Sequence, residues 1–281
     1  MTASPLTRNN FKVVSVLIKF SDPENPNNKI STLIDKSSVL QFEYREGLLN
    51  QFISVTLQIV DTTSQLTDVL VGMEEIELVV KDEINNTKYE FTSGSSNGPL
   101  YVYQIHDKQV IDTGKILVLE LCRKDALESA QQRVCKKYNS IPAADLVQDI
   151  LGDTLKTTKQ YVGNVSSSLN KLSFVPPMSR PYDVLVWSRN KYVAKDQKTT
   201  ASGGSYASAG YLFWETYKGY YFKSIDSIAG QEPTEFTYTT GSGLGGSDEI
   251  YRLNSPQFPK AVNMMAAVSY THLTLPTSKI V

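Results

Sequence analysis

Apolar and polar residues alternate in a series of short segments along the first 122 residues, and this period of two constrains the fold more than any other feature of the sequence. Alternate side chains of an extended chain point to the same side, so each such segment predicts a strand with one buried face. In Phe11–Phe20, the apolar face carries Val14, Val16, Ile18 and Phe20. Six further segments predict strands: Leu40–Arg45, Ile53–Ile59, Ile76–Lys81, Lys88–Thr92, Leu100–Ile105 and Ile116–Cys122.

Residues typical of turns separate several of these strands, at Asn85-Asn86, Gly94–Pro99 and Asp112–Gly114. Seven strands at this spacing predict a closed or nearly closed antiparallel barrel or sandwich from about Phe11 to Cys122, because closure shields strand edges. The alternation places these side chains inside: Val16, Ile18, Leu40, Phe42, Val55, Leu57, Leu78 and Val80. The exposed positions should then include Gln41, Glu43, Thr56 and Gln58.

The spacing of apolar residues changes to three or four after Arg123, which predicts two short amphipathic helices. Ser140 is the predicted N-cap of the second helix, with Pro142 in its first turn and Gly152 at its end. The apolar stripe of the first helix consists of Leu127, Ala130, Val134 and Tyr138. That of the second consists of Leu146, Val147, Ile150 and Leu151.

An extended piece at Lys171–Val175 precedes a third predicted helix, which opens at Arg180-Pro181. Its inward residues are expected to be Val184, Leu185 and Trp187. The composition then shifts to Ser, Gly, Thr and Ala over Lys195–Gly210, which indicates a mobile loop or linker.

Aromatic residues dominate the next two predicted strands, Tyr211–Thr216 and Tyr220–Ile225, which form a hairpin around Lys218-Gly219. A polar alternating strand follows at Thr234–Thr240. The fold class is therefore predicted as mainly β, with a β-barrel over residues 1–122 and a helical α+β element over 123–194. Residues 195–266 would hold the mobile loop and the start of a second, truncated β domain.

Composition argues against several classes of protein, including nucleic-acid-binding, membrane-spanning and metal-binding proteins. The 281 residues carry a net charge of −1, without the basic excess expected of a nucleic-acid-binding protein. No segment reaches the roughly 18 apolar residues of a membrane span, and the start MTASPLTRNN lacks the apolar core of a signal peptide. Synthesis in a cytoplasm is therefore expected. Cys122 and Cys135 form neither a CxxC pair nor a metal-ligand cluster, and both are predicted to be reduced packing residues.

The segment Val268–Thr277 resembles a translated DNA adaptor rather than a protein segment. The string GTC TCT TAT ACA CAT CTG ACG CTG CCG ACG, part of a common transposase-type sequencing adaptor, encodes these ten residues in order. A genuine tail rich in Thr and Leu is the alternative. We therefore leave residues 267–281 out of the fold prediction as read-through that is not native, and expect the natural protein to continue. His272 falls in this segment, which leaves His106 as the one histidine to consider.

Two glycine-rich matches have the wrong surroundings for catalysis or cofactor binding. Gly94–Gly98 fits GxSxG, but a nucleophile elbow needs a following helix, and a strand is predicted here. Gly241–Gly246 fits GxGxxG, but only a polar strand precedes it and no convincing acidic residue follows at the required distance. Both are predicted to be loops.

The remaining titratable residues do not form a predicted site. His106 and Asp107 are adjacent in an extended segment and point to opposite faces, so they are poorly placed to act together. Glu75 and Glu77 flank Ile76 on the polar face of a strand, with Glu74 just before them, and indicate a solvated or partner-facing edge. No catalytic, cofactor-binding or metal-binding residue is therefore assigned, and no cofactor is expected.

The order of blocks resembles the central baseplate hub family of contractile-tailed (myovirus-type) phages. The blocks are VLQFEYREGLLNQFISVTLQIVDTT, GMEEIELVV, LYVYQIHD, KILVLELCRKDALESAQQRVCKKY, IPAADLVQDILGD, NKLSFVPPMSRPYDVLVWSRNKYVA and GYLFWETYKGYYFKSID. The pieces LSFVPPMSRPYDVL and GYLFWETYKGYYFKSID are the most specific. The resemblance covers nearly all of residues 11 to 266 and lacks the part where a second tube-like domain should close.

The resemblance implies two barrels similar to the tail-tube subunit, with smaller α/β elements inserted. It implies a virion protein of the tail baseplate, assembled in the host cytoplasm as a homotrimer that imitates a six-fold tube. The trimer would join the cell-puncturing spike or tail lysozyme protein to the tail tube and other baseplate proteins. DNA would pass through its channel without specific binding, and the protein would not insert stably into a membrane.

Under this interpretation, later strands and a neighbouring subunit should cover the aromatic rings of the hairpin, which are Tyr211, Phe213, Tyr220 and Phe222. A tube or spike-adaptor protein of a contractile injection system is the alternative function. An enzyme, such as a tail-associated glycan hydrolase, is the third; it would need two carboxylates about 5 to 10 Å apart in a cleft.

Overall fold

The computed structural model describes residues 11–21, 29–62, 66, 69–82, 86–111, 114–195, 210–229, 237–239 and 250–252. The chain divides into two units, Met1–Gly230 and Gln231–Val281. The described part is mainly β with antiparallel sheets, so the predicted fold class is confirmed at this level. In the second unit, β13 (Thr237–Thr239) and β14 (Ile250–Arg252) pair in parallel.

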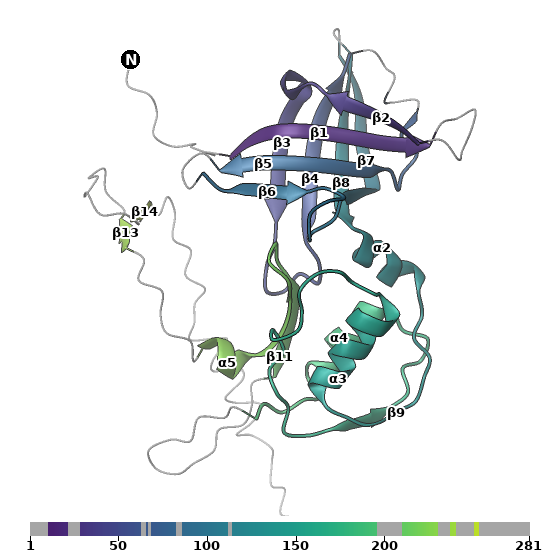
Figure 1. The fold of residues 1–281 in the computed structure, drawn as a ribbon, viewed down its shortest axis with the longest axis vertical. Coiled ribbons are helices and arrows are strands. Elements are labelled where there is room, and N and C mark those ends of the chain that lie inside the picture. Colours follow the sequence, from purple (N-terminus) through teal and green to yellow (C-terminus); the bar gives the residue numbers. More distant parts are fainter. Residues whose placement is uncertain are drawn as a thin grey trace, which may run out of the picture. The chain divides into compact units, whose positions relative to one another are not determined.

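The first unit begins with an antiparallel sheet of eight described strands in the order β2-β1-β5-β7-β8-β4-β3, with β6 on the edge of β5. The sheet bends strongly, so that β3 and β4 lie across the core from β1 and β5 (Figure 1). A short helix, η1 (Lys36–Ser38), joins β2 to β3. The strands are β1 (Phe11–Ser21), β2 (Lys29–Ile34), β3 (Val39–Arg45), β4 (Ser54–Asp61), β5 (Glu75–Asp82), β6 (Lys88–Phe91), β7 (Leu100–Ile111) and β8 (Gly114–Arg123).

All seven predicted strands are present, and β2 is an eighth that the sequence analysis did not predict. Among the described strands, β2 pairs only with β1 and β3 only with β4. The hydrogen-bonded ladder therefore stays open between β2 and β3, and the closed barrel remains a prediction. The apolar side chains of the concave face form the sheet core, which includes Val16, Ile18, Leu57, Ile76, Leu100 and Leu119.

The predicted register is confirmed except near the start of β3. Leu40 was predicted to be buried, which is wrong, because its side chain is 52% exposed. The pairing of β3 with β4 shifts between Val39 and Gln41, and this irregularity gives the inward position to half-buried Val39. Phe42 is half-buried, whereas the other six predicted core residues are buried: Val16, Ile18, Val55, Leu57, Leu78 and Val80. None of the predicted outward residues is buried: Gln41, Glu43, Thr56 and Gln58.

A second part of the first unit, the lobe, follows β8 and has its own core. Its elements are α2 (Lys124–Gln131), β9 (Tyr138–Ile141), α3 (Ala143–Val147), the π-helical turn η2 (Gln148–Thr154), β10 (Leu172–Phe174), α4 (Pro181–Ser188), β11 (Tyr211–Glu215), β12 (Tyr220–Ser224) and α5 (Ile225–Ala229). The lobe core includes Leu146, Ile150, Leu185, Phe213, Tyr220 and Phe222.

The predicted helix boundaries in the lobe need correction. The first helix ends at Gln131 because Gln132 is extended, and Tyr138 begins β9 instead of ending a helix. Ser140 is not an N-cap but a strand residue with φ 48°, and Pro142 is the residue that precedes α3. Gly152 does not stop the second helix, which continues as η2.

The third helix opens after Arg180 as predicted, with Val184 and Leu185 buried. Trp187 was predicted to point inward, which is wrong, because it is 49% exposed. Its ring packs on Phe174 at 4.9 Å between centroids, and Lys191 Nζ lies over the Trp187 ring at 5.9 Å from its centroid. The tryptophan therefore covers the outside of β10 instead of filling the lobe core.

The aromatic hairpin of β11 and β12 forms as predicted, with Phe213 opposite Phe222. Its rings were expected to need later strands for cover, and this expectation is wrong, since each ring is already at most 1% exposed: Tyr211, Phe213, Tyr220 and Phe222. They pack against α3, η2 and α4 in the lobe core. The hairpin therefore shares a core with the preceding helices.

Several predictions lie outside the described residues. Of the loop predicted over Lys195–Gly210, only the two end residues are described, and of the strand Thr234–Thr240 only β13. The second, truncated β domain and the adaptor-like residues 267–281 stay predictions.

Two leucine variants test the register of the sheet. Leu57→Ala should lower the free energy of unfolding by about 2 to 5 kcal/mol, because Leu57 is 0% exposed and its removal leaves a cavity. Leu40→Ala, the matched control, should change it by at most about 0.5 kcal/mol. Urea unfolding followed by circular dichroism measures both; equal losses would contradict the irregularity in β3.

Candidate functional site: a buried charge network

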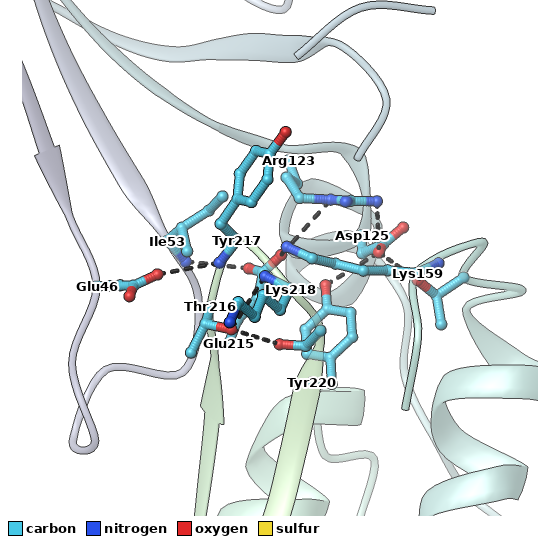
Figure 2. A network of polar contacts seen from close by, with 12 residues as sticks. Glu46, Ile53, Arg123, Asp125, Lys159, Glu215, Thr216, Tyr217, Lys218 and Tyr220 are labelled. Carbon is cyan, nitrogen blue, oxygen red and sulfur yellow. Dashed lines mark hydrogen bonds and ion pairs between the residues drawn. The ribbon is translucent and has the colours of Figure 1, made fainter. Parts of the chain in front are cut away.

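Four charged side chains from three separate stretches of the sequence meet where the lobe joins the sheet (Figure 2). Arg123 is the last residue of β8, Asp125 lies in the first turn of α2, and Glu215 ends β11. Lys159 lies in the loop that follows η2. All four are buried, with exposures between 0% for Glu215 and 6% for Asp125. Two cations thus face two anions in the interior.

Glu215 connects the lobe to the sheet through both of its carboxylate oxygens. Oε1 accepts a hydrogen bond from Lys159 Nζ at 2.9 Å and lies 3.5 Å from Arg123 Nε. Oε2 accepts a hydrogen bond from the backbone N–H of Ile53 at 3.0 Å. Ile53 immediately precedes β4 and belongs to the sheet core, so one side chain of the lobe satisfies a backbone group of the sheet.

Asp125 gathers the other half of the network on one oxygen, Oδ2. Thr157 Oγ1 donates to it at 2.6 Å, Tyr220 OH at 3.0 Å and Arg123 Nη2 at 3.4 Å. The hydroxyl of Tyr182 lies 2.8 Å from that of Tyr220 and extends the chain of hydrogen bonds. Asp125 therefore holds the start of α2, the loop after η2 and the start of β12 together.

Arg123 is the least satisfied member of the network. Within the described part of the chain, its buried Nε and Nη1 atoms have no hydrogen-bond partner. Nε is close enough to Glu215 for attraction between the charges, but the pair lacks hydrogen-bond geometry. Buried cations of this kind are costly unless anions surround them, which makes Asp125 and Glu215 necessary for Arg123.

Burial also sets the direction of the pKa shifts around the network. Burial lowers the pKa of Lys159, and the attraction of Glu215 opposes this shift. Burial, followed by the charge of Glu215, raises the pKa of Tyr182 and of Tyr220 well above the usual phenol value. The same two causes raise the pKa of the Cys122 thiol to about 12. The tyrosines and the thiol therefore stay neutral further into the alkaline range than exposed groups of the same kind.

A second set of contacts fixes the tip of the hairpin against the sheet. Glu46 Oε2, just after β3, accepts from Tyr44 OH at 2.6 Å and from the backbone N–H of Tyr217 at 3.0 Å. Tyr217 OH in turn accepts from the backbone N–H of Glu90 in β6 at 3.0 Å. Its ring packs edge-on against Tyr89 and Phe91. The hairpin is thus held at its tip and at Glu215.

The structure keeps apart the residues that the sequence analysis weighed as catalytic candidates. The GxSxG match Gly94–Gly98 is a turn between β6 and β7, as predicted, and Ser96 is exposed. His106 is exposed on β7. The GxGxxG match Gly241–Gly246 lies outside the described residues.

The three neighbouring glutamates have different environments. Glu75 and Glu77 lie on the outer face and bind Lys19 Nζ at 2.8 and 2.6 Å. Glu74 was grouped with them, but it is buried, and its carboxylate accepts the backbone N–H groups of Val71 and Gly72. It therefore stabilises the turn before β5.

The charge network could not be predicted from the sequence, because its members do not belong to one sequence motif. Ile53 and Glu215 are separated by 162 residues, and Lys159 and Glu215 by 56. The one signal available was a charged residue inside an apolar run, as with Glu215 in YLFWETY and Arg123 after LVLELC. Where such a charge is buried, it needs a partner.

In comparisons with known proteins, no family model matched the chain, and no curated protein matched its sequence. Within the described residues, there is no group of three or more His, Cys, Asp or Glu residues that could hold a metal ion. The helices described here are all too short or too polar to cross a membrane.

Removal of one member of the network should be strongly destabilising. Lys159→Met leaves Glu215 with reduced compensation and should lower the free energy of unfolding by about 3 to 5 kcal/mol. Lys124→Met, which breaks an exposed pair with Glu128, is the matched control and should cost at most about 1 kcal/mol. The double variant Lys159→Met/Glu215→Gln should lose less free energy of unfolding than the two single variants lose together, as measured by urea unfolding. A loss equal to the sum of the two single losses would contradict the coupling between these side chains.

The buried thiol predicts a loss of stability in alkali. The folded chain keeps the Cys122 proton up to a pKa of about 12, whereas an unfolded thiol loses it near 9.0, so stability falls as pH rises between these values. Relative to Cys122→Ala, the native chain should lose about 2 kcal/mol between pH 7 and pH 10.5. Urea unfolding at both pH values measures this difference. Cys135→Ala, which removes an exposed thiol, is the control and should lose as much stability between the two pH values as the native chain. Equal losses in Cys122→Ala and Cys135→Ala would contradict the prediction.

Proposed function

We propose that the chain is a structural hub subunit of a phage tail baseplate, which joins the cell-puncturing spike to the tail tube as a ring-shaped trimer. The support comes first from the sequence, where seven blocks resembling the hub family follow one another in order from VLQFEYREG to GYLFWETYKGYYFKSID. The finer fold that belongs to this proposal has tail-tube-like barrel domains. The curved sheet of β1 to β8 would be the first of them.

The observation that carries the proposal is the contrast between the interior of the first unit and the edges of its sheet. Inside, a buried charge network joins sheet and lobe, and Glu215 contacts both. At one edge, β2 has a single partner among the described strands. Ile30 and Leu33 of β2 are also exposed, at 36% and 69%. Subunits that close into rings need a surface for their neighbours, such as an unpaired strand edge with exposed apolar side chains. Many individually weak contacts between subunits then stabilise the ring together.

The charge of the chain fits a channel that DNA must pass through. A net charge of −1 provides little attraction for a polyanion, so DNA would not be retained. In this proposal, the partners are two further copies of the chain, the spike or tail lysozyme protein, the tail tube and other baseplate proteins. The place of action is the virion, and no cofactor takes part.

The molar mass of the assembled protein tests the proposal. The protein should be expressed from a gene recovered from a longer genomic assembly, in which natural sequence stands in place of the adaptor-like residues 267–281. Light scattering at tens of micromolar should give three chains, and electron microscopy should show rings with pseudo-six-fold symmetry. Rings of six chains would favour the tube protein instead. A protein that stays monomeric, alone and with its spike partner, would contradict the hub function.

A further inference from the structure

A groove opens where the two margins of the curved sheet approach each other without pairing. One side is β3 with the residue that follows it, and the other consists of the start of β1 together with β5 and β6. The groove has a volume of about 1020 Å³. Apolar and aromatic side chains form its floor: Phe42, Tyr44, Val80, Tyr89, Phe91 and Tyr217. We call it the edge groove.

Backbone groups without a strand partner border the edge groove on two sides. Among the described strands, β3 pairs only with β4, so its other edge has no strand partner. The N–H of Val39, the first residue of β3, bonds to the carbonyl of Lys36. On the opposite side, β2 covers β1 only from Val16 onward, so Phe11–Ser15 has no pairing there within the described ranges. Unpaired edges of this kind accept an additional strand.

The third border, β6, is closed to such pairing. The backbone N–H of Glu90 donates to Tyr217 OH at 3.0 Å, and the Glu90 carbonyl accepts from Ser95 Oγ at 3.0 Å. Side chains thus occupy both backbone groups of Glu90, which lies within the short edge that β6 could offer to a further strand. An incoming segment must therefore pair with β3 or with the start of β1.

The charges at the rim favour an acidic occupant. Lys12 and Lys36 line the groove and are exposed, and their side chains have no hydrogen bond or ion pair within the described part of the chain. Lys12 lies directly opposite Lys81, which lies opposite Lys88, so three cations stand in one row across three strands. Like charges in such positions repel each other, and a neighbouring anion relieves the repulsion.

The acidic side chains of the rim are already engaged. Glu43 binds Arg45 through two hydrogen bonds of 2.7 Å, and Glu46 accepts from Tyr44 and Tyr217. The lysines are therefore the charges that remain for a ligand. An extended segment that alternates acidic and apolar side chains would place its apolar side on the aromatic floor and its acidic side near the lysines.

We propose that the edge groove binds an extended segment of another protein, which alternates acidic and apolar residues and adds as a strand to β3 or β1. This docking site does not depend on the proposed hub function. A segment of about seven residues would match the length of β3.

A fluorescein-labelled heptapeptide that alternates glutamate with valine and phenylalanine is the probe, and fluorescence anisotropy with the full chain measures its binding. The native chain should bind it, and Lys12→Glu/Lys36→Glu should weaken binding by about tenfold or more. The matched control Lys137→Glu/Lys171→Glu changes two exposed lysines of the lobe and should leave binding within about twofold of the native chain.

Further peptides separate strand addition from simple charge attraction. A peptide with lysine in place of glutamate should not bind, and a scrambled peptide of the same composition should bind at least about tenfold more weakly. Methylation of alternate backbone amides, in two complementary sets, should abolish binding with one set, because a strand edge presents every second amide. Equal binding of the scrambled or of both methylated peptides would overturn the proposal.

Other occupants give distinct results, each of which overturns the assignment to a partner protein. Dimerisation seen by light scattering and lost in Lys12→Glu/Lys36→Glu would identify a second copy of the chain. Binding that appears only after residues 1–10 are removed would identify the chain's own N-terminal segment. Absence of binding up to about 1 mM peptide would leave the groove without this function.

Discussion

Glu215 is 0% exposed, and its carboxylate is satisfied from the sheet and from the lobe at once. A buried carboxylate must have partners, because loss of its hydration is compensated only by nearby cations and N–H groups. Lys159, Arg123 and the backbone of Ile53 provide them. The position of the hairpin, the loop after η2 and the end of β8 therefore depend on one side chain.

The parts of this fold that the sequence predicted are those that local rules determine. Alternation is visible within eight residues, so β4 and β5 could be assigned with their buried faces. The irregularity at Leu40 could not, because it depends on how β3 pairs with β4. The helix predicted through Tyr138 failed for a related reason. Val134 and Tyr138 are apolar at helical spacing, but Val134 bridges to Ser179 and Tyr138 pairs with Phe174.

The candidate site was less predictable than the fold. Each member of the charge network lies in a segment that makes sense alone, such as the helical turn around Asp125 or the strand that ends at Glu215. Only the packing of lobe against sheet brings them together. The edge groove escaped prediction for the opposite reason. Sequence patterns favour closure, and they do not show where two strand edges approach without pairing.

The charges at the junction of lobe and sheet also determine the register of the β11–β12 hairpin, which apolar packing alone does not determine. Along β11 and the turn that follows it, every second position holds Tyr211, Phe213, Glu215 and Tyr217 in order. A slip of the hairpin by two residues would keep the same set of side chains on the inner face, so the alternation alone would not prevent it. The slip would, however, place Phe213 or Tyr217 beside Lys159 and Arg123, and two buried cations would lose their anion. The network therefore gives the hairpin one register, and with it the position of Tyr217 at the floor of the edge groove.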